Sequence, residues 1–531
     1  MKAFTEPLLS LAGFEEMTKT AEKSSGLISV TGCIDAQKSQ MIYAFGGHRK
    51  NKLIVTFGEQ KAKELYDEYS FFDKEVVYYP SKDVLFYQSD IRGNLLTAER
   101  IRALKAIREQ ERVTLVTTFD ALMNTMAPIE KMWENVLTLE QGQLLDLKEI
   151  QAALIRMGYE KEYQVQTMGQ FSVRGGILDV FPLTEENPIR IELWGDEIDT
   201  IRYFDCESQK SIENIDRVSI YPAAELVLSD EEKAGGIEKL KAEAKRVSDK
   251  LRKQMKTEEA HRVTVMADEL TEEWGELSMY AGMDAFLSYF FDERVGILDY
   301  FNPSDSLIFF DELTRCTEQG KLTETEFSES MKQRLAMGYI LPGQMNGLFT
   351  EKEIVAKLGK YSCIALAALD NKANGLHQLG SYGIHCQSVS PYNNSFELLI
   401  KDLKRYKKNG YRVILLSGSR TRAKRLSEDI TDQGITCFYT ENYDHELFEG
   451  QIMVCYGKVR RGFEYPILKF AVITESDIFG AQQKKKKRHR TYEGEKIQSF
   501  TDLSVGDYVV HENHGLGIYR GIEKLEGDKK V

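Results

Sequence analysis

The stretch Gly26-Leu-Ile-Ser-Val-Thr-Gly-Cys-Ile-Asp-Ala-Gln-Lys-Ser39 decides the fold class. Its first six residues are a short apolar run typical of a buried strand, and residues 40–45 continue with the composition of a helix. The loop between them differs at one position from the phosphate-binding pattern G-x-x-x-x-G-K-[ST]. This strand–loop–helix order predicts a parallel α/β sheet.

The loop keeps Gly32, Lys38 and Ser39, but Gln37 stands where the pattern requires its second glycine. In an intact loop, backbone N–H groups hold the phosphates, while the Lys and Ser side chains contact phosphate and magnesium. A Cβ at the glycine position hinders the close approach of the backbone and disfavours a positive φ. The match is therefore either coincidental or the mark of an ATPase fold that no longer handles nucleotide.

Composition sets the broad class of the protein. A length of 531 residues predicts about three to four domains, and 42% apolar with 29% charged residues is typical of a globular protein. The net charge of −13 argues against nucleic-acid affinity over the whole surface but allows a local basic patch. The seven cysteines are scattered without a C-x-x-C pair, which predicts a cytoplasmic protein without disulfides or metal. No signal peptide or membrane span is visible, so we expect no membrane contact.

The pattern of apolar residues changes several times along the chain, and we expect six parts. They are residues 1–135, the first part of an ATPase-like lobe; 136–222, an inserted antiparallel domain; 223–349, the second part of the lobe with a charged helix at 229–260; 350–480, an α/β domain; 481–498, a basic linker; and 499–531, a β-rich piece.

Three further stretches are similar to parts of an ATPase. The apolar run at 306–310 ends in Asp311-Glu312, where a metal-holding and a water-activating acid would lie. Residues 410–419 and 457–480 resemble the second lobe of a helicase, but no arginine-finger motif follows them. Phosphoryl transfer depends on positioning and charge stabilisation. The replacement of the loop glycine by Gln37 and the missing arginine finger would therefore each severely impair catalysis. We therefore expect no catalytic residue, and a degenerate nucleotide loop made of Gly32, Gln37, Lys38, Ser39, Asp311 and Glu312.

The middle segment contains the most specific motif. Gly169-Gln-Phe-Ser-Val-Arg-Gly-Gly-Ile-Leu-Asp-Val-Phe-Pro182 precedes Ile189-Arg-Ile-Glu-Leu-Trp-Gly-Asp-Glu-Ile-Asp-Thr-Ile-Arg202. Together they resemble domain 2 of the B subunit of the bacterial nucleotide-excision nuclease, a module that also opens the bacterial transcription-repair coupling factors. The resemblance implies that Arg174, Arg190 and Glu192 bind the A subunit of that nuclease.

Strand alternation supports this interpretation, because it places Arg190, Glu192 and Trp194 on one face and three apolar residues on the other. The alternative is an ordinary cross-strand ion pair on a solvated sheet. Ser172 stands where relatives often carry a basic residue, which puts the strength of the A-subunit contact in doubt but not its location.

The C-terminal residues 502–522 resemble the start of the RNA-polymerase-interaction domain of the coupling factors. Residues 509–510 and 518–519 would be strands, with Gly515 and Gly517 forming the bend. The resemblance implies that the chain is the N-terminal part of a coupling factor without its motor, the part that uses ATP and Mg and moves on double-stranded DNA. We therefore expect no cofactor, poor order over 499–531, and weak or absent binding of RNA polymerase.

The expected fold is α/β and multidomain, with degenerate helicase-like parallel-sheet lobes, an inserted antiparallel α+β domain and a partial C-terminal β domain. The favoured function is an adaptor that recruits the excision nuclease through its A subunit to stalled RNA polymerase. The alternative is an active DNA-dependent ATPase of the B-subunit type that uses Lys38, Ser39, Asp311 and Glu312. The basic run at 484–490 is either a solvated linker or a DNA contact that weakens with salt.

Overall fold

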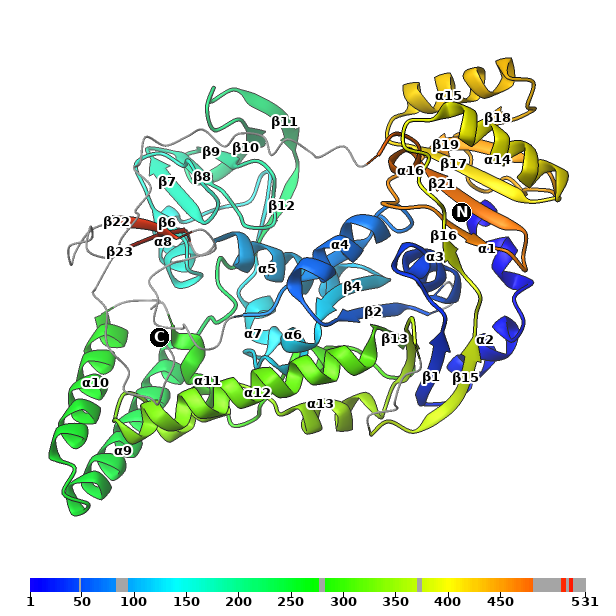
Figure 1. The fold of residues 1–531 in the computed structure, drawn as a ribbon. Helices are drawn as coiled ribbons and strands as arrows, with labels where there is room; N and C mark the ends of the chain where they lie inside the picture. The colour runs from blue at the N-terminus through cyan, green and yellow to red at the C-terminus, as the bar shows by residue number, and fades with distance from the viewer. Residues whose placement is uncertain are drawn as a thin grey trace.

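The computed structural model describes residues 1–46, 49–82, 94–276, 282–369, 375–480, 508–511 and 515–518. A parallel sheet and a mixed sheet, each with helices on its faces, and a separate, mainly antiparallel sheet make up most of the molecule (Figure 1). This arrangement confirms the predicted multidomain α/β class. Within the described ranges, no helix has the length and apolar character needed to cross a bilayer.

The first lobe is built on a seven-stranded parallel sheet with the order β15-β1-β14-β13-β2-β4-β3. Its strands are β1 (Gly26–Thr31), β2 (Asn51–Thr56), β3 (Val76–Tyr79), β4 (Val113–Thr118), β13 (Ser306–Asp311), β14 (Ser362–Leu366) and β15 (Gln378–Gly383). The flanking helices are α1 (Lys2–Leu9), α2 (Phe14–Lys23), α3 (Asp35–Phe45), α4 (Glu59–Tyr69), α5 (Asn94–Glu109), α6 (Phe119–Met123), α7 (Ile129–Glu134), α12 (Leu313–Ala336) and α13 (Glu351–Leu358). Every residue of β13 is buried, as expected for a parallel strand covered on both faces.

The second domain starts later in the chain than residue 350, the boundary predicted from the sequence. The strands β14 and β15 pair with β1, so they belong to the first sheet. The second sheet has the order β16-β20-β21-β17-β19-β18. Its elements are β16 (Gln387–Ser388), α14 (Phe396–Lys408), β17 (Arg412–Ser417), α15 (Arg420–Asp432), β18 (Phe438–Tyr439), β19 (Ile452–Tyr456), β20 (Phe463–Tyr465), β21 (Phe470–Thr474) and α16 (Glu475–Phe479). Helix–strand alternation continues across this boundary, and alternation alone cannot assign a strand to one sheet or the other.

The antiparallel domain, called the module below, is a six-stranded sheet with the order β11-β10-β9-β8-β7-β6 beside the pair β12-β5. Its elements are β5 (Leu137–Glu140), α8 (Leu147–Arg156), β6 (Glu160–Lys161), β7 (Gln170–Arg174), β8 (Ile177–Val180), β9 (Ile189–Trp194), β10 (Glu197–Phe204), β11 (Ser211–Ile215) and β12 (Arg217–Ile220). Along β9, Ile189 and Ile191 are fully buried, whereas Arg190, Glu192 and Trp194 are not. The predicted alternation of faces is therefore confirmed.

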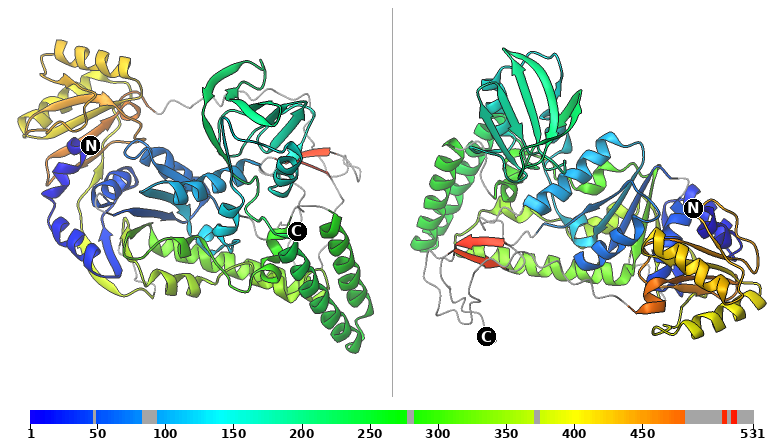
Figure 2. Two further views of the ribbon diagram at one scale, coloured as in Figure 1. Left: turned by 180° about the vertical axis from the view of Figure 1, so that it is seen from behind. Right: turned by 90° about the horizontal axis from the view of Figure 1, so that it is seen from above.

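A pair of long helices, α9 (Asp230–Lys253) and α10 (Thr257–Glu276), projects from the first lobe as a helical arm (Figures 1 and 2). The sequence predicted a single helix over 229–260, but the chain turns at Met255, which has a φ of 61°. Trp274 packs edge-on against Phe286 at the base of the arm. The arm therefore has an apolar contact surface despite its charged composition.

Two adjacent glycines in α9 are expected to respond in opposite ways to substitution by alanine. A Cβ at Gly235 meets nothing within 4 Å, whereas a Cβ at Gly236 would lie 2.2 Å from the ring of Phe290. Gly235→Ala should stabilise the arm by about 0.5–1 kcal/mol through helix propensity. Gly236→Ala should instead destabilise it by about 1–3 kcal/mol because the ring must move.

Thermal unfolding monitored by circular dichroism at 222 nm would compare these two variants with the parent chain. Equal effects of the two substitutions would show that Phe290 does not pack against α9 as described.

The N-terminal helices connect the first lobe and the second domain. The N–H of Ala3 donates to the carbonyl of Tyr443 at 3.0 Å, and the Gln40 side chain donates to the carbonyl of Phe4 at 2.6 Å. Figure 2 shows the first helices beside the second domain in both views. The start of the chain therefore lies between α3 of the first lobe and the second domain.

The strands β22 (Tyr508–His511) and β23 (Gly515–Ile518) form an antiparallel pair near the C-terminus. Gly515 and Gly517 lie inside β23, opposite His511 and Val509, so their predicted role in the bend is wrong. The expected poor order over the rest of 499–531 and the role of the basic run at 484–490 fall outside the described residues.

Candidate functional site

Backbone groups from later parts of the same chain bond to and pack against the loop between β1 and α3. Gly32 has a φ of 78°, and a Cβ there would lie 2.1 Å from the carbonyl oxygen of Ile384. The N–H groups of Gly32 and Cys33 donate to the carbonyls of Ala368 at 3.3 Å and Ala367 at 2.9 Å. Backbone donors that would hold a phosphate in an intact loop are thus already bonded within the fold.

Lys38, Asp311 and Glu312 meet at the carboxyl ends of β1 and β13. The Lys38 ammonium donates to Asp311 Oδ1 at 2.5 Å and to Glu312 Oε1 at 2.9 Å, and only 1% of the lysine side chain is exposed. Burial lowers the pKa of Lys38, but the two carboxylates outweigh burial and raise this pKa above its usual value. The lysine charge is therefore neutralised inside the protein and does not face a phosphate site.

The remaining loop residues do not complete a nucleotide site. Gln37 is fully buried, and its amide atoms have no hydrogen-bond partner in the part of the chain that the structure describes. The Ser39 hydroxyl lies 3.4 Å from Glu68 of α4, away from the acids of β13. Burial raises the pKa of Glu68 to about 7, and its carboxylate accepts the N–H of Arg460 from the second domain.

The described residues contain no cluster of His, Cys, Asp and Glu that could hold a metal. Lys38 is bonded inward and Ser39 lies against Glu68, so in this structure neither side chain is placed to contact a phosphate or magnesium.

Restoring the missing glycine is expected to leave the chain without ATPase activity. In Gln37→Gly, the N–H groups of Gly32 and Cys33 would still be bonded, and Lys38 would still be neutralised. We expect neither the parent chain nor the variant to bind a fluorescent ATP analogue with magnesium. DNA-stimulated phosphate release above that of a Lys38→Ala control would contradict this prediction.

A second candidate site lies on the outer face of the module, where Asp179 of β8 binds two arginines. The Arg190 guanidinium makes two bonds to Asp179, at 2.7 and 2.8 Å, and Arg174 contacts the same carboxylate at 2.8 Å. Arg190 also stacks over the ring of Phe204 at 4.4 Å. The Asp179 side chain is only 1% exposed, whereas that of Arg174 is 38% exposed. A buried acid therefore holds one exposed cation, Arg174, and one largely buried cation, Arg190, whose side chain is 13% exposed.

Glu192 belongs to a neighbouring pair on the same face. It accepts from Arg202 of β10 at 2.9 Å, and this hydrogen bond lowers the pKa of Glu192. The structure thus brings Arg174 and Arg190 together through Asp179 and places Glu192 beside them with its own partner. Neither Asp179 nor Arg202 was predicted as a site residue from the sequence, although both stand in the quoted motif.

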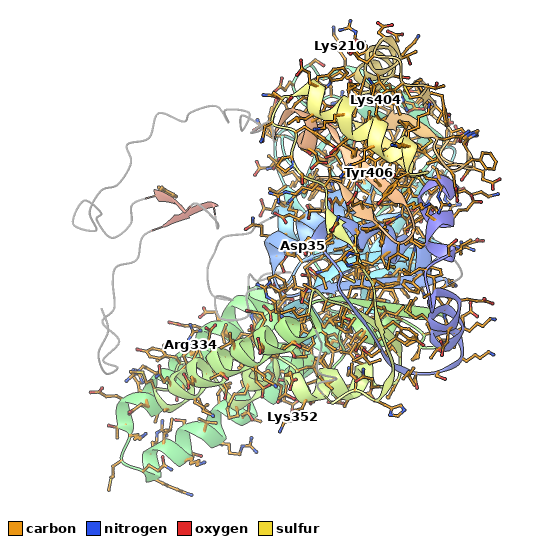
Figure 3. The ribbon with its side chains drawn as sticks, turned by 45° about the vertical axis from the view of Figure 1, so that its right-hand side comes forward. Asp35, Lys210, Arg334, Lys352, Lys404 and Tyr406 are labelled. Atoms are coloured by element: carbon orange, nitrogen blue, oxygen red, sulfur yellow. The ribbon has the colours of Figure 1, made fainter. Side chains whose placement is uncertain are left out.

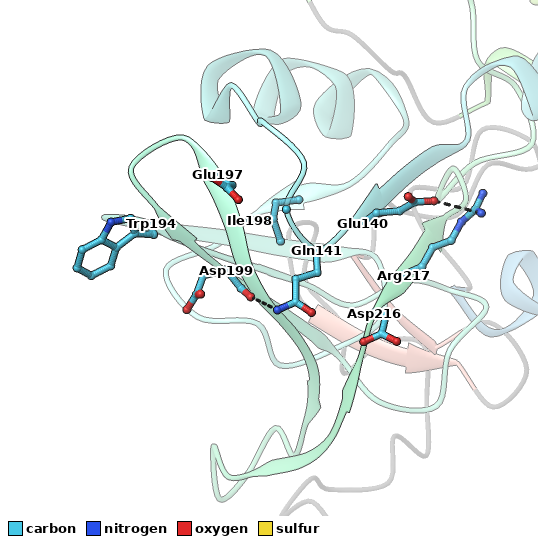
Figure 4. A pocket seen from close by; sticks show the side chains of 9 residues that line it. Glu140, Gln141, Trp194, Glu197, Ile198, Asp199, Asp216 and Arg217 are labelled. Atoms are coloured by element: carbon cyan, nitrogen blue, oxygen red, sulfur yellow. Dashed lines mark hydrogen bonds and ion pairs between the residues drawn. The ribbon is translucent and has the colours of Figure 1, made fainter.

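Trp194 ends the row of β9 residues on this face. Its side chain is 84% exposed and projects beyond Glu197 and Asp199 (Figure 4). Beside it lies an open hollow of about 710 Å³, whose lining includes Glu140 and Arg217, an ion pair at 3.1 Å. An exposed tryptophan on the same strand as a fixed guanidinium group is typical of a protein-binding surface.

Two segments of the chain match described protein families. Residues 137–226 match the UvrB interaction domain, and residues 503–531 match the CarD-like/TRCF RID domain. The first match covers the whole antiparallel module, including the face with Asp179 and Trp194.

The chain is similar over most of its length to curated proteins named transcription-repair-coupling factor. The Bacillus subtilis (strain 168) protein is 30% identical over 89% of this chain and 40% of its own length. The Staphylococcus haemolyticus protein is 29% identical over 94% of this chain and 42% of its own length. The Staphylococcus aureus (strain MRSA252) protein is 28% identical over 97% of this chain and 43% of its own length. The chain therefore spans about two fifths of the length of these relatives.

Proposed function

We propose that this chain, which is similar to the N-terminal part of transcription-repair-coupling factors, is a DNA-repair adaptor. In this proposal it recruits the nucleotide-excision nuclease, through the nuclease A subunit, to RNA polymerase stalled at DNA damage. The observation that carries the proposal is the arginine pair on Asp179, which lies within the segment that matches the UvrB interaction domain.

The chemistry of this face suits a protein partner with exposed carboxylates. The arginines are already held by Asp179, so they lose little side-chain entropy when a partner binds. Trp194 adds a large apolar surface at the end of the same strand. Arginine and tryptophan are both enriched among residues that dominate binding energies.

The alternative, an active DNA-dependent ATPase, is disfavoured by the bonded loop around Gly32 and the inward ion pairs of Lys38. The match over 503–531 supports the proposal that these residues begin an RNA-polymerase-binding domain. We expect this chain to bind RNA polymerase weakly or not at all. In this proposal the motor of the longer coupling factors binds ATP, magnesium and double-stranded DNA.

Removing either arginine of the pair is expected to weaken binding of the A subunit. Arg174→Ala and Arg190→Ala should each cost about 1–3 kcal/mol if these charged contacts are buried in the complex. A pull-down followed by calorimetric titration with the purified A subunit would measure the change. Arg156→Ala is the matched control, because Arg156 is exposed on α8, outside the face that contains Asp179.

Circular dichroism should be unchanged in all three variants. If both Arg174→Ala and Arg190→Ala bind as tightly as the parent chain, the A-subunit site lies elsewhere.

A further inference from the structure

We infer that the second α/β domain carries a binding surface for the phosphate backbone of nucleic acid, at the carboxyl edge of its parallel sheet. The cations of this surface, called the basic edge below, are Arg420, Arg422, Lys424, Arg425, Lys458 and Arg461, all of which are exposed. This surface is separate from the module and goes beyond the adaptor function.

The topology of the sheet gathers these cations at one edge. The parallel strands β21, β17 and β19 are neighbours. Arg420 follows the end of β17, and Lys458 follows the end of β19. Because the carboxyl ends of parallel strands meet at one edge of a sheet, the two loops lie side by side. Figure 1 shows α16, which follows β21, on the side of this domain that faces the module.

The charge distribution of α15 opposes the helix dipole. Its four cations lie within residues 420–425, and its first turn has no acid. In contrast, α9 has three acids in its first turn and basic residues in its last turn, and α14 follows the same rule. Cations at a helix N-terminus are unfavourable because they repel the positive end of the helix dipole. This repulsion is relieved by an anion that binds from outside the helix, as Glu475 does for Arg422.

An anion of the chain itself already occupies the start of this surface. The Glu475 carboxylate accepts the N–H of Gly418 at 2.6 Å and the Ser417 hydroxyl at 2.8 Å, and it pairs with Arg422. A backbone N–H, a hydroxyl and a guanidinium form a donor set that suits a phosphate oxygen equally well. This corner therefore holds one oxyanion in the structure, the carboxylate of Glu475.

The other acids near the basic edge leave most of its cations available. Arg420 pairs with Glu441 at 3.2 Å, but the two side chains are 71% and 55% exposed, so the pair is weak. Glu64 pairs with Arg460, and Asp477 accepts the N–H of Gly462. Within the described ranges, neither Lys458 nor Arg461 makes an ion pair with an acid.

The spacing of the cations favours an extended polyanion over a single small anion. The cations are spread over two loops and the first turns of α15, and all are exposed. A single phosphate would contact only one or two of them. A nucleic-acid strand offers a phosphate at regular steps, and each contact releases counterions and adds to affinity.

The test measures the binding of the full chain to a fluorescein-labelled 30-base-pair DNA duplex by fluorescence anisotropy. The double variant R420E/K458E is expected to bind at least 10-fold more weakly at 100 mM salt. It should also lower the slope of log K against log salt by roughly 0.9 for each lost phosphate contact. Glu475→Gln should bind two- to five-fold more tightly, because Arg422 is released from its internal carboxylate.

Two controls make the outcome decisive. The matched variant K404E/K407E changes two exposed cations of α14, outside the two loops of the basic edge, and should leave affinity unchanged; Figure 3 labels Lys404 on this helix. A variant in which the cations of residues 484–490 are replaced by glutamine reports the contribution of that run alone.

Unchanged DNA affinity of R420E/K458E would overturn the inference. Equal capture of the duplex and of poly-glutamate by the parent chain would also overturn it, because the surface would then recognise acidic protein. DNA binding by the basic edge does not depend on A-subunit binding by the module. The pull-down can therefore contradict the adaptor proposal without affecting the anisotropy result, and the reverse is also true.

Discussion

Glu225→Gln is expected to destabilise the first lobe by about 3–5 kcal/mol, because it removes one partner of a buried ion pair. The Arg100 guanidinium donates to both carboxylate oxygens of Glu225, at 2.7 and 3.1 Å, and to the carbonyl of Pro80 at 2.7 Å. Both side chains are buried, and Lys82 lies 3.1 Å from the same carboxylate. Glutamine at this position would leave a buried guanidinium without its counter-charge.

The same pair predicts loss of stability in acid. Burial alone would raise the pKa of Glu225, but Arg100 and Lys82 outweigh it and lower this pKa to about 2, from 4.5 in the unfolded chain. A carboxyl group with a lowered pKa stabilises the folded state above the unfolded pKa. Its contribution, of the order of 3 kcal/mol, is fully present above pH 4.5 and is lost as the pH falls from 4.5 to 2.

The measurement is the free energy of opening of the first lobe, from hydrogen exchange of the β4 amides, at pH 5–7 for Glu225→Gln and from pH 5 down to pH 2 in the parent chain for the loss of stability in acid. Glu185→Gln is a suitable control, because the contact of Glu185 with Lys105 at 3.1 Å is partly exposed and its loss should cost less than about 1 kcal/mol. The double variant R100M/E225L should be closer to the parent chain than Glu225→Gln, since it leaves no unpaired charge. A change below 1 kcal/mol in Glu225→Gln would contradict the prediction.

Gly32→Ala is expected to destabilise the first lobe by about 2–5 kcal/mol, because alanine at this position meets both a strained backbone and a close contact. The left-handed φ of 78° accounts for about 1–2 kcal/mol. The rest comes from overlap of the new Cβ with the Ile384 carbonyl oxygen, 2.1 Å away, because displaced backbone costs about as much as an overpacked core.

Gly434→Ala separates these two contributions. Gly434 has a φ of 77°, and a Cβ there meets nothing within 4 Å, so this variant should show only the strain of the left-handed backbone. Thermal unfolding of both variants gives the comparison. Equal destabilisation by Gly32→Ala and Gly434→Ala would mean that the contact with Ile384 is not tight.

The sequence predicted the elements that depend on local patterns. The strand at 26–31, the strand that ends in Asp311 and the alternating faces of β9 are present in the structure. Local patterns did not reveal which residues of distant elements pair. Asp179 looked like an ordinary strand residue, and Arg100 looked like one charge on a helix, because pairing with Arg190 or Glu225 depends on the tertiary fold. Likewise, β14 could not be assigned to the first sheet until its neighbours were known.

The position of β1 in its sheet has a consequence for biosynthesis. β1 lies between β14 and β15, so both of its neighbours come from residues 362–383, more than 300 residues later in the chain. At roughly 5–20 residues per second, a ribosome needs on the order of 20–70 s to make that intervening stretch. During this time the apolar residues Leu27, Ile28 and Val30 have no native partner strand. The first lobe can therefore close only late in translation, and its earliest segment is a natural client for chaperones that bind nascent chains.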